Sequence, residues 1–220
     1  MNKKTWKPIP PLFRRNKKKV YEKVIAAYGL VYQIGESNLL RKPSKPVLLK
    51  EIKKKEFQEK ISYLKKVLIK YRKLTGMGRG VTAVQIGIPE RFSVIYTGKA
   101  LRSKTSRIRS KDLIVIINPK ITKQSTKLYK YPEICMSANP IIAPVVRPAW
   151  IEFEYYDENG DKKYWNRKDI NKEGKICNRV FQHEIDHMDG IINIDRVNSR
   201  ELILESDPKF YKNAAFEEVV

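Results

Sequence analysis

Two histidines four residues apart are the strongest chemical signal in this sequence. His183 and His187 are the only histidines in the chain. On a helix this spacing places both imidazoles on one face, where they can bind a single metal ion. Glu184 lies one step round the helix, so its carboxylate can reach a water on that ion without becoming a ligand. The pattern therefore predicts metal-assisted hydrolysis.

A third metal ligand remains to be found, because a catalytic site usually combines three protein ligands with one open position. Asn193 stands where the metzincin protease motif has its third histidine, so that ligand is missing. A thermolysin-like site would use a downstream glutamate, and Glu201 or Glu205 lies at a suitable distance on an expected helix. Upstream, Cys135 lies between two proline-containing turns, and its thiolate would complete a Cys-His-His site. Cys135 is the preferred candidate, and the glutamates are the alternative.

Three short segments resemble, in the same order, the motifs of the peptide deformylase family. That family carries G-x-G-[LI]-A-A-x-Q, E-G-C-L-S and Q-H-E-x-D-H. The corresponding segments here are GRGVTAVQ at 78–85, EICMS at 133–137 and QHEIDH at 182–187. Weaker likeness extends the resemblance over residues 36–197. Three ordered motifs are far more specific than one.

Three of the positions at which the chain departs from these motifs bear on the expected site. Thr82 replaces an alanine and adds a hydroxyl that needs a partner if it is buried. Met136 replaces a leucine of similar volume and leaves the backbone donor intact. Ile134 replaces a glycine, and a β-branched residue excludes positive φ and adds bulk. We therefore expect Ile134 to narrow the substrate groove or to change specificity.

The resemblance implies a role for each matching residue. Cys135, His183 and His187 would bind the metal, and Glu184 would act as general base and then as proton donor to the leaving amine. Gln85 and the backbone N–H of Met136 would hold the formyl oxygen as it gains charge. The residues implied to contact the substrate peptide are Gly78, Gly80, Val81 and Ile134.

The implied activity is removal of the N-formyl group from formyl-methionine at the N-terminus of newly made polypeptides. The implied cofactor is one divalent ion, with Fe(II) as the native metal and zinc, nickel or cobalt able to occupy the site. Two alternatives stay open. A zincin-type metallopeptidase would leave Cys135 dispensable. A weakly active, deformylase-like protein that binds the ribosome or nucleic acid would have its groove closed by Ile134 and would bind without turnover.

The expected fold is α+β, a single domain with mixed or antiparallel sheets around the metal-binding helix. Residues 1–35 are expected to form a basic extension, 36–197 the catalytic domain and 198–220 a tail packed on it or trailing from it. Apolar residues from Phe57 to Tyr71 recur at steps of four and three, which predicts a helix that ends near Gly76. Strands are predicted at 92–96, 113–117, 150–155 and 162–165, with a hairpin turn at 159–160 and a basic loop at 101–111.

Charge is distributed unevenly along the chain. Residues 1–130 hold 34 Lys and Arg against 7 Asp and Glu, whereas residues 131–220 hold 12 against 17. The excess of positive charge in residues 1–130 favours a polyanionic partner. For an enzyme that acts on newly made chains, the ribosome is the natural polyanion. A lysine-rich composition with solvated faces and no partner is the alternative.

Composition indicates a soluble, cytoplasmic protein of unspecified oligomeric state. No apolar run approaches the ~18 residues that a membrane span needs. Residues 1–30 contain nine basic residues and one acid, but they lack serine and carry three prolines, so an organelle transit segment is the lesser alternative. The second cysteine, Cys177, is expected to be a buried free thiol near the start of the motif helix.

Overall fold

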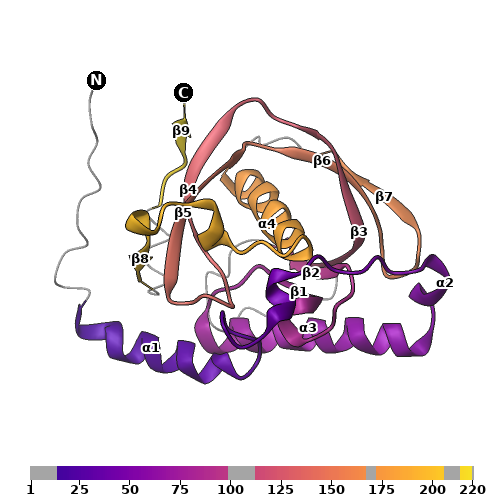
Figure 1. Ribbon diagram of the computed structural model, residues 1–220, viewed down its shortest axis with the longest axis horizontal. Helices are drawn as coiled ribbons and strands as arrows, with labels where there is room; N and C mark the ends of the chain where they lie inside the picture. Colours follow the sequence, from indigo (N-terminus) through magenta and orange to yellow (C-terminus); the bar gives the residue numbers. More distant parts are fainter. Residues whose placement is uncertain (1–13, 99–111, 167–171, 206–213, 220) are drawn as a thin grey trace.

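The computed structural model describes residues 14–98, 112–166, 172–205 and 214–219. Within those ranges two antiparallel sheets enclose a central helix (Figure 1), which confirms the expected α+β, single-domain fold. One sheet has the order β1-β2-β3-β6-β7 and the other β8-β5-β4-β9. The helices are α1 (Arg14–Tyr28), α2 (Leu49–Ile52), α3 (Lys55–Thr75) and the central α4 (Lys172–Met188).

The five-stranded sheet consists of β1 (Gly80–Thr82), β2 (Phe92–Tyr96), β3 (Leu113–Gln124), β6 (Ile151–Tyr156) and β7 (Lys162–Trp165). The four-stranded sheet consists of β4 (Leu128–Ile134), β5 (Ile141–Pro148), β8 (Ile203–Leu204) and β9 (Glu217–Val219). Short 3-10 turns occur at Asn38–Arg41, Ala83–Ile86, Asn193–Arg196 and Ser199–Glu201. The predicted strands and the hairpin between β6 and β7 are confirmed.

Side-chain alternation gives the five-stranded sheet two buried faces. On β2, Phe92 and Val94 pack in the cluster that contains α3, whereas Ile95 packs in the cluster that contains Phe181 and Ile185 of α4. Successive side chains of a strand point to opposite faces, so the sheet is covered by α3 on one side and by α4 on the other. Residues of β1 and β2 that alternate toward α4 therefore face the motif helix.

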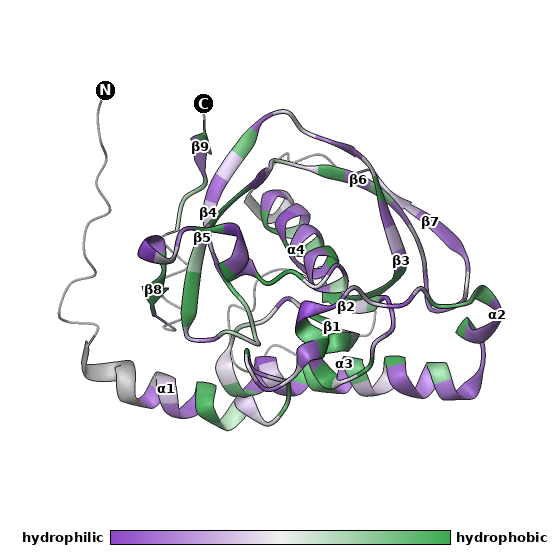
Figure 2. Cartoon of the chain, in the orientation of Figure 1, coloured by the Kyte–Doolittle hydropathy of each residue, from purple (hydrophilic) through white to green (hydrophobic). Residues whose placement is uncertain are grey.

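Helix α3 forms as its sequence predicts. Its apolar positions make one buried stripe that packs on the sheet, and Figure 2 shows apolar and polar bands alternating along it. The helix stops at Gly76, whose φ of 74° is left-handed and whose N–H bonds to the Arg72 carbonyl at 2.8 Å. This confirms the predicted end of the helix, and it leads the chain directly into the first motif.

Gly190 ends the motif helix and docks it. Its φ is +78°, and a Cβ at this position would lie 2.9 Å from the Arg41 carbonyl carbon and from the Lys42 nitrogen. Only glycine satisfies both conditions without displacing backbone. The C-terminal turn of α4, which carries His187, is thereby fixed against the segment at 41–42.

The chain outside residues 36–197 contributes to the packing. Helix α1 buries Val24 and Ala27 and packs against α3, while β8 pairs with β5 and β9 pairs with β4. Cys177 forms no disulfide, as predicted, but it is half-buried where a buried thiol was expected, near the N-terminal end of α4. The predicted loop at 101–111 lies outside the described residues. No helix among the described residues is long and apolar enough to cross a membrane.

Candidate metal centre

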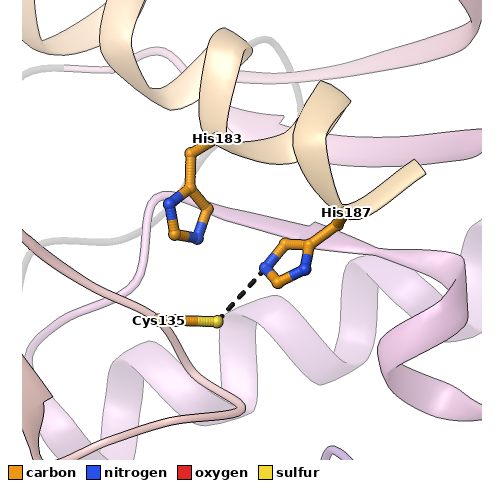
Figure 3. Close-up of side chains that lie close together, drawn as sticks. All are labelled: Cys135, His183 and His187. Carbon is orange, nitrogen blue, oxygen red and sulfur yellow. Dashed lines mark hydrogen bonds between the residues drawn. The ribbon is translucent and has the colours of Figure 1, made fainter. Parts of the chain in front are cut away.

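Cys135, His183 and His187 come together at the inner face of α4 (Figure 3). One potential ligand atom from each lies within 4.8 Å of the others, and Cys135 Sγ is 3.1 Å from His187 Nε2. Both histidine rings project from one helix face, with centroids 4.9 Å apart. A thiolate and two imidazoles in so compact a group form a donor set that suits Zn²⁺ or Fe²⁺.

A tight turn after β4 presents the cysteine. The Ala138 N–H bonds to the Cys135 carbonyl at 3.2 Å, and the Ser137 N–H lies 3.4 Å from Cys135 Sγ, to which it donates. A backbone donor on sulfur stabilises the thiolate, which is the form that binds metal. Cys135 is fully buried and His187 is buried beside it, while the His183 side chain remains 12% exposed.

Glu133 orients His183. Its carboxylate lies 3.1 Å from His183 Nδ1, which leaves Nε2 of that ring available to a metal. Arg147 donates two hydrogen bonds to the same carboxylate at 2.7 and 2.9 Å, and Arg179 approaches it at 2.6 Å. Burial alone would raise the pKa of Glu133, but Arg147 and Arg179 hold it well below its usual range. The carboxylate is therefore ionised where it supports His183.

The same network extends to the C-terminal turn of α4. Arg147 also bonds to Asp186 at 2.7 Å, and Arg196 bonds to the other oxygen of Asp186 at 2.5 Å. Removing one member of a buried ion pair costs about 3–5 kcal/mol, because the remaining charge is left unpaired. The network thus ties α4 to β4 and β5 and fixes the distance between the two histidines and Cys135.

The two imidazoles differ in their proton affinity. Burial lowers the pKa of His187 well below its usual value, which keeps that ring neutral and able to bind a metal. For His183, burial also favours the neutral ring, but Cys135 and Glu133 raise its pKa well above the usual value. A proton and a metal ion therefore compete for His183.

Glu184 lies on the side of α4 that faces β1. The carboxylate is buried, and Thr82 Oγ1 donates a hydrogen bond to Glu184 Oε2 at 2.6 Å. Gly80 makes room for it, since a Cβ there would lie 2.3 Å from Glu184 Oε1. Burial raises the pKa of Glu184, although the charge of His183 and the Thr82 hydroxyl oppose the shift. A buried carboxylate of raised basicity beside three metal donors suits proton transfer.

Gln85 is oriented by the backbone of β1. Its Oε1 accepts the Thr82 N–H at 2.8 Å, which identifies the other amide atom as the donor. Nε2 donates to Ser137 Oγ at 3.0 Å and lies 3.8 Å from Cys135 Sγ. The amide donor therefore points at the cysteine turn. The next residue of this turn, Met136, has a buried side chain that packs over Gly78, where a Cβ would meet its Cε at 2.4 Å.

Ile134 fits the local backbone without strain. It is the last residue of β4, pairs with Ile142 of β5, and is half-buried. Among the described residues Asn118 is the non-glycine with positive φ, so position 134 does not need the freedom of glycine. The other residues predicted to contact substrate belong to the five-stranded sheet, where Gly80 and Val81 form part of the edge strand β1 and Gly78 precedes it.

The downstream glutamates do not join the metal donors. Glu201 is exposed and pairs with Lys130, and Glu205 lies beyond β8, outside the cluster formed by Cys135 and the histidines. The expected helix there is wrong: a 3-10 turn and the short strand β8 replace it, because Ile203 and Leu204 pair with β5. Asn193, at the position of the missing histidine, instead donates to the Glu133 carbonyl at 3.1 Å.

Four supporting residues were not anticipated from the sequence: Ser93, Arg147, Arg179 and Asp186. Two of them left a readable signal. Arg179 lies four residues before His183 and Asp186 three residues after it, so helical spacing places both near the ligand face. Ser93 and Arg147 reach the site through strand register and long-range packing.

A potential Cys-His-His donor set with a neighbouring carboxylate is typical of one class of protein, the mononuclear metal-dependent hydrolases. Comparison with known proteins narrows it. The sequence profile of the family described as polypeptide deformylase matches residues 30–202. The chain belongs to the polypeptide deformylase family, and peptide deformylation is the activity that this membership assigns to it.

Individual relatives agree with this assignment. A peptide deformylase of Picosynechococcus is 35% identical over 61% of this chain and 65% of its own length, so the match spans just under two thirds of that relative. "Peptide deformylase 1A, chloroplastic" of Solanum lycopersicum is 30% identical over 83% of this chain and 69% of its own. The crystal structure of a Synechococcus elongatus peptide deformylase in complex with actinonin has a TM-score of 0.61 at 29% identity, covering 77% of this chain and 80% of that one.

Proposed function

We propose that Cys135, His183 and His187 hold one divalent ion, with which the chain removes the formyl group from formyl-methionine at the start of new polypeptides. The observation that carries this proposal is the gathering of the three donors within 4.8 Å, beside a buried carboxylate. When bound, the ion supplies Lewis acidity, which polarises a carbonyl and makes a water more acidic.

In this proposal Glu184 moves the proton. Its carboxylate takes a proton from the attacking water and later donates it to the nitrogen of the leaving amine. Water and the N-formyl amide of the substrate thereby become formate and a free N-terminus. Gln85 Nε2 and the Met136 N–H donate to the formyl oxygen as it becomes negative. The orientation of the Gln85 amide supports its role, because the Thr82 N–H already occupies Oε1.

We place the peptide part of the substrate between β1 and the end of β4, against Gly78, Gly80, Val81 and Ile134. Support comes from the topology, since β1 is at one edge of the five-stranded sheet and carries residues that touch Glu184. An edge strand can pair with an extended peptide through backbone hydrogen bonds. Formyl-methionine alone would lack most of this pairing, so we expect a higher KM for it than for a tripeptide.

Turnover on defined peptides tests the function. Anaerobically prepared protein is expected to release formate from formyl-Met-Ala-Ser and to leave acetyl-Met-Ala-Ser and Met-Ala-Ser unchanged. A parallel assay with formyl-methionine measures how much the peptide groove contributes to turnover. Equal hydrolysis of the acetylated peptide, or cleavage of the Met-Ala bond, would reject deformylation and favour a metallopeptidase.

We propose Fe(II) as the native ion. One thiolate and two imidazoles also accept zinc, nickel or cobalt, so the donor set alone leaves the choice open. Apoprotein reconstituted under anaerobic conditions with each ion in turn separates them. We expect the highest kcat with Fe(II) and loss of that activity in air, whereas equal activity of the zinc form before and after exposure to air would favour zinc.

We infer that the basic N-terminal half binds the ribosome. The exposed side of α3 carries Lys66, Lys70 and Lys73, spaced at helical steps along one stripe. Their replacement by glutamine is expected to reduce co-sedimentation with ribosomes at low salt and to leave turnover of short peptides unchanged. Glutamine at Lys162 and Lys163, on β7, serves as the control for charge lost elsewhere. An equal reduction by both variants would argue against a specific surface.

We propose that the protein acts in the cytoplasm. The packing of α1 supports this, because a transit segment reaching residue 30 would remove a helix that buries Val24 and Ala27. The chloroplastic relative from Solanum lycopersicum supports the organelle alternative. Sequencing the N-terminus of the protein isolated from its source cells distinguishes the two, since import would remove residues from the start of the chain.

A further inference from the structure

The carboxylate of Glu184 is held by a hydroxyl where the family motif has a methyl group. Thr82 stands at the position of an alanine in G-x-G-[LI]-A-A-x-Q. Its Oγ1 lies 2.6 Å from Glu184 Oε2, and both side chains are buried, Thr82 completely. A hydrogen bond of this length to a buried carboxylate is charge-assisted and stronger than one between neutral groups.

Strand register brings a second hydroxyl to the same place. Thr82 pairs directly with Ser93 of β2, so both side chains stand on the face of the sheet that is turned to α4. Ser93 Oγ donates to the Val81 carbonyl at 2.9 Å and is also a hydrogen-bonding neighbour of Glu184. A hydroxyl has one hydrogen, and the short bond to Val81 competes for that of Ser93. The second acceptor of Thr82 is the Glu184 backbone carbonyl, which at 3.3 Å is farther from Oγ1 than Oε2 is at 2.6 Å. Thr82 is therefore the principal donor to the carboxylate.

We propose that Thr82 is a positioning residue for proton transfer: its hydroxyl fixes Glu184 Oε2 and leaves Oε1 as the atom that takes and returns the proton. The inference rests on the proposed function. Glu184 reaches across from α4 to β1, and Gly80 provides space there without providing a donor from a side chain. The Thr82 hydroxyl thus supplies the contact that selects one orientation of the carboxylate.

The hydrogen bond between Thr82 and Glu184 is expected to affect the rate of the chemical step. A carboxylate that samples several orientations spends less time in the reactive one, so its loss of alignment lowers kcat. The Thr82 hydroxyl is directed at Glu184, so this proposal gives it no contact with the substrate. A residue that acts through Glu184 in this way should change kcat and leave KM and the metal content unchanged.

Three substitutions at one position test the proposal. Thr82→Val keeps the shape and removes the hydroxyl, Thr82→Ala restores the motif residue and fits without steric conflict, and Thr82→Ser keeps the donor. We expect valine and alanine to lower kcat for formyl-Met-Ala-Ser about tenfold, and serine to stay within about twofold of the parent. KM and bound metal are expected to stay at parental values in all three.

Thr75→Val is the matched control, because Thr75 is the other buried threonine among the described residues and its hydroxyl bonds to the Tyr71 carbonyl at 2.9 Å. It is expected to lower Tm without lowering kcat. If Thr82→Val and Thr82→Ala had the kcat of the parent, or if Thr82→Ser lost as much kcat as they do, the inference would be overturned. An active parent enzyme would still support the proposed function. A parent without deformylase activity would overturn the proposed function and this inference with it.

Discussion

Glu184→Gln is expected to lower kcat by about 10²–10⁴-fold while the metal stays bound. Glutamine has the same shape as glutamate, and its carbonyl oxygen can still accept the hydrogen bond that Thr82 donates at 2.6 Å. It cannot take a proton from water at neutral pH. The metal donors Cys135, His183 and His187 are unchanged, so the variant should keep its metal and lose only kcat.

Three measurements on one preparation decide this prediction: the metal content, kcat on formyl-Met-Ala-Ser, and Tm. Glu184 is buried, and replacing a buried charge with a neutral amide removes a desolvation cost, so Tm is expected to hold or to rise. Glu90→Gln serves as the control, since it removes a carboxylate that pairs with Lys60 away from the metal donors. Parental turnover by Glu184→Gln would refute the role of the carboxylate in proton transfer.

Local sequence patterns predicted the elements that local forces determine. The alternation of steps of four and three from Phe57 to Tyr71 specifies one buried face, and Gly76 supplies the left-handed residue that stops the helix. The two histidines belong to the same category, because a separation of four residues fixes their relative direction on any helix. For these features no knowledge of the rest of the chain was required.

The third donor could not be placed in this way. Cys135 is 52 residues from His187, and only the path of β4 and β5 brings the two within 3.1 Å. Its position between two proline-containing turns made Cys135 the preferred candidate, but spacing left Glu201 and Glu205 open as alternatives. The family resemblance favoured Cys135, and strand β8 gives the physical reason, since its pairing with β5 directs the segment that follows Glu201 along the four-stranded sheet.

The contacts that support the site were hidden for the same reason. Thr82 and Glu184 are 102 residues apart, and their contact depends on the register of β1 against β2 and on the rotation of α4. The sequence indicated that the Thr82 hydroxyl would need a hydrogen-bond partner if it were buried. It did not indicate which residue that partner would be. Ile134 illustrates the converse, because a bulky residue in place of glycine proved compatible with a regular strand.

Cys135→Ala is expected to abolish stable metal binding and, with it, turnover. The thiolate is one of three donors and the one that carries a charge, and its Sγ also accepts the Ser137 N–H. Changes to groups that only support a metal ligand already cost about 10–100-fold in affinity, so loss of the ligand itself should exceed about a hundredfold. After dialysis the variant is expected to hold far less than one equivalent of metal.

Cys177→Ala is the matched control, because the chain has two cysteines and Cys177 lies outside the donor cluster. It should keep both metal and activity. Alanine at position 135 leaves a small cavity in a fully buried position, so the Tm of both apoproteins must be compared as well. If Cys135→Ala retained its metal and its activity, the thiolate would not be a ligand. In that case, loss of both metal and activity in Glu201→Gln or Glu205→Gln would establish a zincin-type site in place of the one that the geometry of α4 and β4 favours.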